Sequence, residues 1–144
     1  MGSTKRAEYE EMGGQIKLEE ISKVFYDKIY QDPWLKQYFV DVPQEHIERQ
    51  QVMFMQAALG GENLYCGQTP PAAHKHMYIT NELYQARKVL LDEAFVECNA
   101  GSKLIEKWLR IDDAFFNRIV KVSPQDCHLR YKSDKILNFV RPHH

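Results

Sequence analysis

The chain has 144 residues, which fits one domain with one hydrophobic core, and its formal net charge is -1. This charge argues against a nucleic-acid partner, because a nucleic-acid-binding protein needs excess basic residues to neutralise phosphates. No apolar run is long enough to span a bilayer, and the N-terminus lacks the apolar stretch of a signal peptide. The three cysteines are an odd number without metal-type spacing, which disfavours a disulfide framework and favours a reducing compartment. We therefore expect a cytoplasmic protein without a membrane partner.

Apolar residues recur at helical spacing along the chain, and glycine or proline separates the blocks. No alternating β-branched run or tight hairpin signal indicates a strand. The pattern predicts helices over residues 15–31, 34–39, 44–59, around His74, 81–97 and 103–119. We therefore expect an all-α fold in which the helices pack around one core.

The ends of the chain and one long loop fall outside this helical pattern. Residues 1–8 are expected to form a flexible N-terminal lead, before a domain over residues 9–122. Residues 123–144 are polar with scattered apolar positions, and they read as a C-terminal extension that is either a tail or one more short helix. Residues 62–71 contain two prolines and no helical period. A helical domain rarely keeps such a loop without a functional reason, so the segment that follows it is of interest.

Polar residues occupy helix faces that are otherwise suited to burial. On the helix over 44–59, Gln50 and Gln51 share one face with Ile47 and Phe54, because these positions lie at i, i+3, i+4 and i+7. A buried amide needs hydrogen-bond partners, so this face is either half exposed or lines a polar site. Tyr26 on the preceding helix poses the same alternative, since a buried hydroxyl also needs a partner.

The segment after the long loop carries two histidines. His74 and His76 point to different faces of a regular helix and cannot chelate one ion there, which disfavours a zinc site. A single neutral imidazole on a short helix suits the iron of a porphyrin, although a lone histidine is more often a surface residue. No Gly-rich phosphate loop and no GxSxG motif competes with this interpretation.

Four segments resemble truncated haemoglobins, most closely the first of the main groups of that family. They are YEEMGG from residue 9, FYDKIYQDPWLKQYF from residue 25, QQVMFMQAALGG from residue 50 and YCGQTPPAAHKHMYIT from residue 65. The resemblance extends from about residue 9 to residue 120 and has no gap as far as Thr80. It implies a truncated globin fold, a compact helical sandwich around one haem b.

The resemblance also implies roles for individual residues. His74 would be the proximal ligand of the iron, and Tyr26 and Gln51 would be distal hydrogen-bonding groups, with Gln50 beside them. Ile47 takes the place where many globins have a distal histidine. The residues expected to contact the cofactor are His74, Phe39, Phe25, Phe54, Ile47 and Leu83.

Two features depart from the family pattern. Arg87 lies thirteen residues after His74, at a position that is usually apolar or tryptophan. Either the helix shifts register there or an arginine stands at the pocket edge. The basic residues that usually meet the haem propionates do not transfer to this chain, which leaves three candidates: His46, Arg49 and Lys75.

The resemblance implies reversible binding of a diatomic gas, namely dioxygen, nitric oxide or carbon monoxide, for storage or delivery. Dioxygen is favoured because phenol and amide donors stabilise a ligand that carries partial negative charge. One alternative is an enzyme that converts nitric oxide to nitrate with electrons from a separate reductase. Another is a helical interaction module without a cofactor, which predicts a colourless protein.

Overall fold

The computed structural model describes residues 2–142. The elements are α1 (Gly2–Glu11), α2 (Gly14–Gln31), η1 (Leu35–Phe39), α3 (Gln44–Leu59), α4 (Pro70–His74), α5 (Asn81–Glu97), α6 (Ser102–Ala114), α7 (Phe116–Ile119) and η2 (Pro124–Asp126). Within residues 2–142 the β-type pairing is limited to an isolated bridge between Met77 and Leu137. The expected all-α fold is thereby confirmed.

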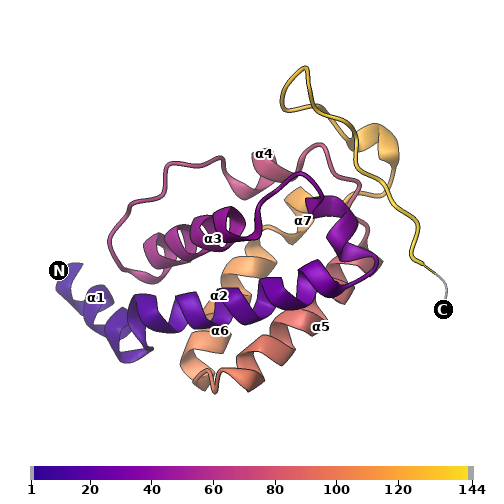
Figure 1. Ribbon diagram of the computed structural model, residues 1–144. Coiled ribbons are helices and arrows are strands. Elements are labelled where there is room, and N and C mark those ends of the chain that lie inside the picture. Colours follow the sequence, from indigo (N-terminus) through magenta and orange to yellow (C-terminus); the bar gives the residue numbers. More distant parts are fainter. Residues whose placement is uncertain (1, 143–144) are drawn as a thin grey trace.

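The long helices form two layers. Figure 1 shows α3 lying along α2 on one side, while α5 and α6 lie on the other. Helix α2 packs against both α3 and α5, and α3 also packs against α6. The short helix α4 sits at the end of the loop that follows α3, near α7. The arrangement is the helical sandwich that the sequence predicts.

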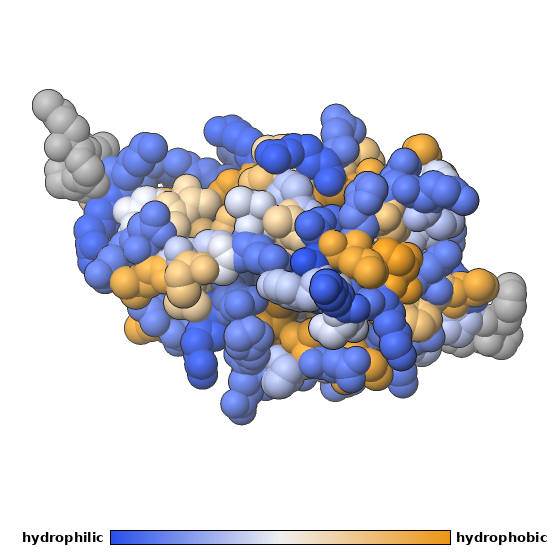
Figure 2. All heavy atoms as spheres, turned by 90° about the horizontal axis from the view of Figure 1, so that it is seen from above, coloured by the Kyte–Doolittle hydropathy of each residue, from blue (hydrophilic) through white to orange (hydrophobic). Residues whose placement is uncertain are grey.

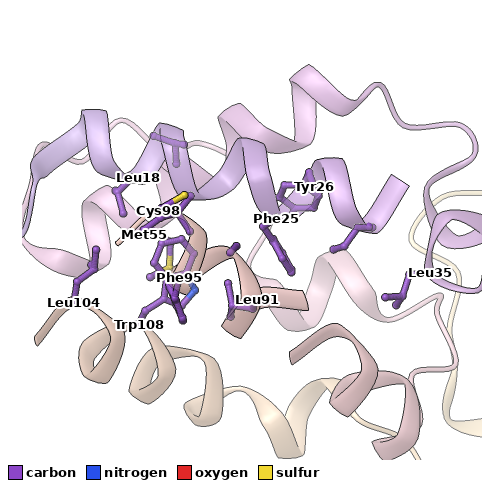
Figure 3. Packing of buried hydrophobic residues seen from close by; sticks show 14 of the residues in the cluster. Leu18, Phe25, Tyr26, Leu35, Met55, Leu91, Phe95, Cys98, Leu104 and Trp108 are labelled. Carbon is purple, nitrogen blue, oxygen red and sulfur yellow. The ribbon is translucent and has the colours of Figure 1, made fainter. Parts of the chain in front are cut away.

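Apolar side chains of α2, α5 and α6 make the centre of the core. The predicted stripe on α2 is buried at Leu18, Ile21, Phe25 and Ile29. In Figure 3, Phe95 and Trp108 lie together between the layers, with ring centroids 5.4 Å apart in an edge-on arrangement. Edge-on aromatic pairs of this kind are favoured by the ring quadrupoles.

The N-terminal lead differs from the prediction, because residues from Gly2 onward belong to helix α1 instead of a flexible segment. Met1 lies outside the described residues. Two long-range contacts hold the end of this helix: Tyr9 donates a 3.0 Å hydrogen bond to Gln56 Oε1, and Glu8 pairs with Lys107 at 3.0 Å. Both partners are remote in sequence, and local composition gives no sign of them.

The end of α3 is set by Gly60. Its φ of 103° is a left-handed conformation that favours glycine, as the sequence predicts for a helix end. A Cβ at this position would lie 2.9 Å from the carbonyl oxygen of Lys5, so glycine also allows α1 to approach.

The C-terminal third departs from the prediction in two ways. The helix expected over 103–119 is divided, since α6 ends at Ala114 and the short α7 follows Phe115. Between α7 and residue 142 the chain contains η2 and is otherwise not helical, and Figure 1 shows it running beyond the helical layers beside the segment after α4.

The face seen in Figure 2 is mostly hydrophilic, with hydrophobic side chains in small separate groups. Scattered groups of this size are normal for a folded domain. Over residues 2–142, none of the helices combines the length and the apolar character needed to cross a membrane.

Candidate functional site

A cavity of about 210 Å³ lies between the two layers, next to α4. Its walls come from α2, η1, α3, α4, α5 and α6, and they are mainly apolar with a few polar groups. Cavities with such walls are the usual sites for small molecules and cofactors.

Eight of the nine site residues predicted from the sequence line this cavity. They are Tyr26, Phe39, Ile47, Gln50, Gln51, Phe54, His74 and Leu83. They come from five separate elements, and the fold brings them together. None of the three candidates for propionate contact, His46, Arg49 and Lys75, is among the lining residues.

Phe25 is the exception, and the prediction that it contacts the cofactor is not supported by its position. Its side chain is fully buried in the core and does not line the cavity. On α2 the cavity wall therefore includes Tyr26 but not Phe25, whose side chain belongs to the core. Figure 3 shows Phe25 pointing from α2 toward the side of Leu91.

His74 is the last residue of α4, and its side chain has a defined hydrogen-bonding state. The ring Nδ1 lies 2.6 Å from the carbonyl oxygen of Pro70. A carbonyl can only accept, so Nδ1 carries the proton and Nε2 keeps its lone pair. Burial lowers the pKa of His74 to about 4, although the Pro70 carbonyl acts in the opposite direction. At neutral pH the imidazole is therefore uncharged and its Nε2 can bind a metal.

His76 lies in a different environment. It is buried, and it does not line the cavity. Its Nδ1 has no hydrogen-bond partner within residues 2–142. His74 alone of the pair faces the cavity, as the sequence predicts, but the cause differs: α4 ends at His74, and His76 lies in the turn after it.

Tyr26 presents a buried hydroxyl to the cavity. Its side chain is 7% exposed, and no described residue makes a hydrogen bond with the phenol oxygen. Burial raises the pKa of Tyr26 well above its ordinary value, while the nearby charge of Arg87 works against this rise. The phenol therefore stays protonated and remains a donor. The ring of Phe39 meets that of Tyr26 edge-on at 6.1 Å.

Gln51 is oriented by a neighbour on α2. Its Oε1 accepts a 2.9 Å hydrogen bond from the hydroxyl of Ser22. With Oε1 bound to Ser22, the NH2 group is the end of Gln51 that is left to donate toward the cavity. Tyr26 and Gln51 thus bring two donors to the same space.

Arg87 also lines the cavity, which resolves the alternative left by the sequence: the arginine stands in the pocket wall. Its two terminal nitrogens bind both oxygens of Asp112, at 2.7 and 3.1 Å. Tyr84 donates a longer hydrogen bond of 3.4 Å to the same carboxylate. Burial opposes the charged form, but the paired carboxylate raises the pKa of Arg87 above its ordinary value. Arg87 therefore contributes a fixed positive charge at the cavity.

The sequence did not single out Asp112 and Tyr84 as site residues. Tyr84 lies three residues before Arg87, so the two share a helix face, and this spacing could have linked them. Asp112 is on α6, and nothing local in the sequence connects it with Arg87.

The residues present fit a b-type haem. Such a cofactor needs one neutral imidazole with an available nitrogen, mostly apolar walls and few polar groups. His74 supplies the nitrogen, and aromatic and aliphatic side chains supply most of the wall. The donors Tyr26 and Gln51 and the ion pair of Arg87 with Asp112 are among the polar groups of the cavity.

Comparison with known proteins agrees with this geometry. The family model described as bacterial-like globin matches residues 7–120. A group 1 truncated hemoglobin of Tetrahymena pyriformis is 32% identical over 114 residues, which cover 79% of this chain and 85% of that protein. A group 1 truncated hemoglobin of Tetrahymena thermophila is 36% identical over 78 residues, and the match spans 64% of its length.

Solved structures show the same fold. The Fe(III) form of the T. pyriformis truncated hemoglobin aligns with a TM-score of 0.71 at 25% identity, covering 79% of this chain and 97% of that one. The 2/2 hemoglobin of Synechococcus sp. PCC 7002, solved with covalently attached heme, aligns with a TM-score of 0.68 at 25% identity. It covers 76% of this chain and 93% of that chain.

These matches confirm the family that the sequence motifs suggest, and membership implies a haem group and a diatomic gas ligand. The chain belongs to the bacterial-like globin family, and within that family it resembles the group 1 truncated haemoglobins.

Proposed function

We propose that the chain holds haem b through His74 and binds a diatomic gas reversibly, with dioxygen as the favoured ligand. One observation carries this proposal: a neutral imidazole with an available Nε2 faces a cavity that also contains the donors of Tyr26 and Gln51. When bound, haem supplies an iron with an open coordination position for a small gas.

Residues of the chain orient the iron ligand, bind the gas and exclude water. The Pro70 carbonyl fixes the tautomer and orientation of His74. Tyr26 and the NH2 group of Gln51 donate hydrogen bonds to a ligand that gains negative charge, and such donors favour dioxygen over less polar gases. Phe39, Ile47, Phe54 and Leu83 exclude water from the cavity, which protects the ferrous state from oxidation.

The first test concerns the ligand histidine. Replacing His74 by Ala should abolish the normal absorption spectrum of the haem-reconstituted protein, because no other imidazole faces the cavity within residues 2–142. The matched control is His76→Ala, which should leave the spectrum nearly unchanged. A normal spectrum in His74→Ala, or its loss in His76→Ala alone, would overturn the assignment.

The second test concerns the preference for dioxygen. Tyr26→Phe should raise the dissociation rate of dioxygen by about one to two decades, since a hydrogen bond to a charged acceptor is worth roughly 1.5–3 kcal/mol. Tyr30→Phe is the control, because the Tyr30 hydroxyl donates to the carbonyl of Val42 and does not line the cavity. Carbon monoxide should respond less. Equal dissociation rates of dioxygen in wild type, Tyr26→Phe and Gln51→Ala would mean that neither side chain stabilises bound dioxygen, and the preference for dioxygen would be wrong.

A dioxygen-retaining pocket also suits the conversion of nitric oxide to nitrate, with a separate reductase as the electron source. Stopped-flow mixing of the dioxygen-loaded protein with nitric oxide separates the two functions. Slow nitrate formation, on the time scale of dioxygen release, supports binding or delivery, whereas fast formation supports the enzyme.

A further inference from the structure

The residues that follow the globin match form a C-terminal strap, defined here as residues 121–142. The family match ends at residue 120, so the strap lies outside it. Most of its side chains are exposed or half-buried, and it has no helix apart from the short η2. Most of its hydrogen bonds with the domain have a backbone group on at least one side, and they concentrate on one segment.

That segment is Ala73–Tyr78, which contains His74. Five consecutive carbonyls, those of residues 73–77, accept hydrogen bonds from the strap. The donors are Arg130 Nη1 to Ala73 (3.5 Å), Lys121 Nζ to His74 (3.1 Å), the His128 amide to Lys75 (2.8 Å), the Leu137 amide to His76 (2.9 Å) and Lys121 Nζ to Met77 (2.7 Å). In return, the amide of Tyr78 donates to the carbonyl of Leu137 at 2.8 Å.

The short helix α4, whose last two residues belong to this segment, needs hydrogen-bond donors of this kind. The last four carbonyls of any α-helix lack partners within the helix, and α4 has only five residues. An isolated helix of this length is not stable by itself. None of the α4 residues is fully buried, so apolar packing does little to fix their position. The strap therefore supplies hydrogen bonds that α4 cannot make alone.

The far end of the strap is anchored to a different wall of the site. The indole nitrogen of Trp34 donates a 2.8 Å hydrogen bond to the carbonyl of Phe139, and the amide of Phe139 donates to the Tyr38 hydroxyl at 3.1 Å. The rings of Tyr38 and Phe139 are 5.0 Å apart and perpendicular. Tyr38 itself lines the cavity and belongs to η1, which follows the C-terminal end of α2. The strap therefore connects the His74 segment with η1, on another wall of the cavity.

We propose that the C-terminal strap is the positioning element of the proximal histidine: it holds the backbone around His74, and so it sets how the imidazole is presented and how slowly haem is lost. This rests on the proposed role of His74 as the iron ligand. Lys121 carries most of the effect among the side chains, because its ammonium group binds the carbonyls of His74 and Met77 at once.

The test uses full-length variants that each remove donors. Lys121→Met keeps the aliphatic stem and removes the ammonium group, while Leu137→Pro removes the N–H that binds the His76 carbonyl. Transfer of haem to an acceptor apoglobin should become about tenfold faster in Lys121→Met and about three- to tenfold faster in Leu137→Pro. The iron–histidine stretching band in the resonance Raman spectrum of the ferrous protein should shift or broaden in both.

Matched controls lie on the same strap. Lys135→Met removes an equal charge from an exposed side chain without a hydrogen bond to any of residues 2–142. Val140→Pro introduces proline at a residue that is 83% exposed and whose amide binds none of those residues either. Both controls should keep the wild-type rate of haem loss and the wild-type Raman band.

A measurement without haem separates this proposal from the proposed function. In the apoprotein, hydrogen exchange of the Tyr78 amide should be faster in Lys121→Met than in Lys135→Met, because its acceptor belongs to the strap. A wild-type protein that binds no haem would refute the function, and this exchange would still report on the strap. Wild-type exchange in both donor variants, or faster exchange with unchanged haem loss and Raman band, would overturn the positioning role.

Discussion

The core around Phe95 and the segment around His74 are held in place in different ways. Phe95 is 2% exposed and packs against Trp108, and the neighbouring Leu91 and Leu104 are also buried. In the His74 segment, α4 has no fully buried residue, His76 and Met77 after it are buried, and the backbone is held by hydrogen bonds from residues 121–137. Apolar burial supplies most of the stability in the first region, whereas directed hydrogen bonds fix position in the second.

This difference matters for a ligand site. Each hydrogen bond contributes less to stability than a buried aromatic side chain, but it constrains distance and angle more closely. Segments with few buried apolar contacts also open locally at a lower free energy than the core. The histidine segment can therefore be adjusted by the strap without repacking the helices that carry the fold.

The largest expected effect tests the core. Phe95→Ala should lower the free energy of unfolding by about 3–5 kcal/mol, because the lost side chain leaves a cavity against Trp108. Chemical denaturation measures this change. Val96→Ala is the control, since Val96 on the same helix is 77% exposed and its loss should change stability by only about 0.5 kcal/mol. A loss below 1 kcal/mol in Phe95→Ala would show that burial does not dominate this region.

An intermediate effect is expected where the two regions meet. Arg87→Leu leaves the carboxylate of Asp112 with only the longer bond from Tyr84. The side chains of Arg87 and Asp112 are 26% and 15% exposed. We therefore expect the free energy of unfolding to fall by about 1–3 kcal/mol, less than for a fully buried pair. The double variant Arg87→Leu/Asp112→Leu should be more stable than Arg87→Leu in the same denaturation assay. If it is less stable, the cost does not come from an unpaired carboxylate.

The sequence predicted the parts of the fold that depend on side-chain burial. The stripe from Leu18 to Ile29 gave α2, and glycine at position 60 gave the end of α3, because apolar spacing and left-handed geometry are local properties. The order of α1 was missed because Tyr9 and Glu8 are held by residues far away in the chain. The break after Ala114 was missed as well, since the apolar spacing continues through it.

The candidate site was predictable where the family motif and helical phase agreed. Tyr26, Gln51 and His74 line the cavity as expected, but Phe25 does not. Helical phase could not have excluded Phe25, because adjacent residues of a helix can both face one cavity, as Gln50 and Gln51 do. The strap was invisible because its contacts are made mostly by backbone groups, which every residue type except proline carries. The pairing of Arg87 with Asp112 joins two helices and has no local signature.

The smallest expected effect tests the strap through one ion pair. Arg130 binds the carboxylate of Asp134 through Nε at 2.9 Å and through Nη2 at 3.1 Å, and it also reaches the carbonyl of Ala73. The hydrogen bond from Arg130 lowers the pKa of Asp134 from 3.8 to about 2. His76 and Tyr131 lie beside this pair: burial and the charge of Arg130 lower the pKa of His76, while the Asp134 carboxylate raises it, and the Arg130 guanidinium stacks on the Tyr131 ring at 5.5 Å.

Because the folded-state pKa of Asp134 is lowered, the contribution of this pair is complete above pH 3.8 and is lost as the pH falls toward 2. An NMR titration of the Asp134 carboxyl should therefore show a midpoint near 2. At neutral pH, Asp134→Asn should speed hydrogen exchange of the Tyr78 amide by less than about fivefold, since the pair joins residues only four apart and Asn keeps an oxygen that can accept from Arg130. The same substitution should leave the free energy of unfolding unchanged, because this depends mainly on burial in the core around Phe95. A midpoint at the ordinary value of 3.8 would mean that Asp134 does not hold the Arg130 side chain, and the hydrogen bond from Arg130 to the Ala73 carbonyl would then lack a fixed donor.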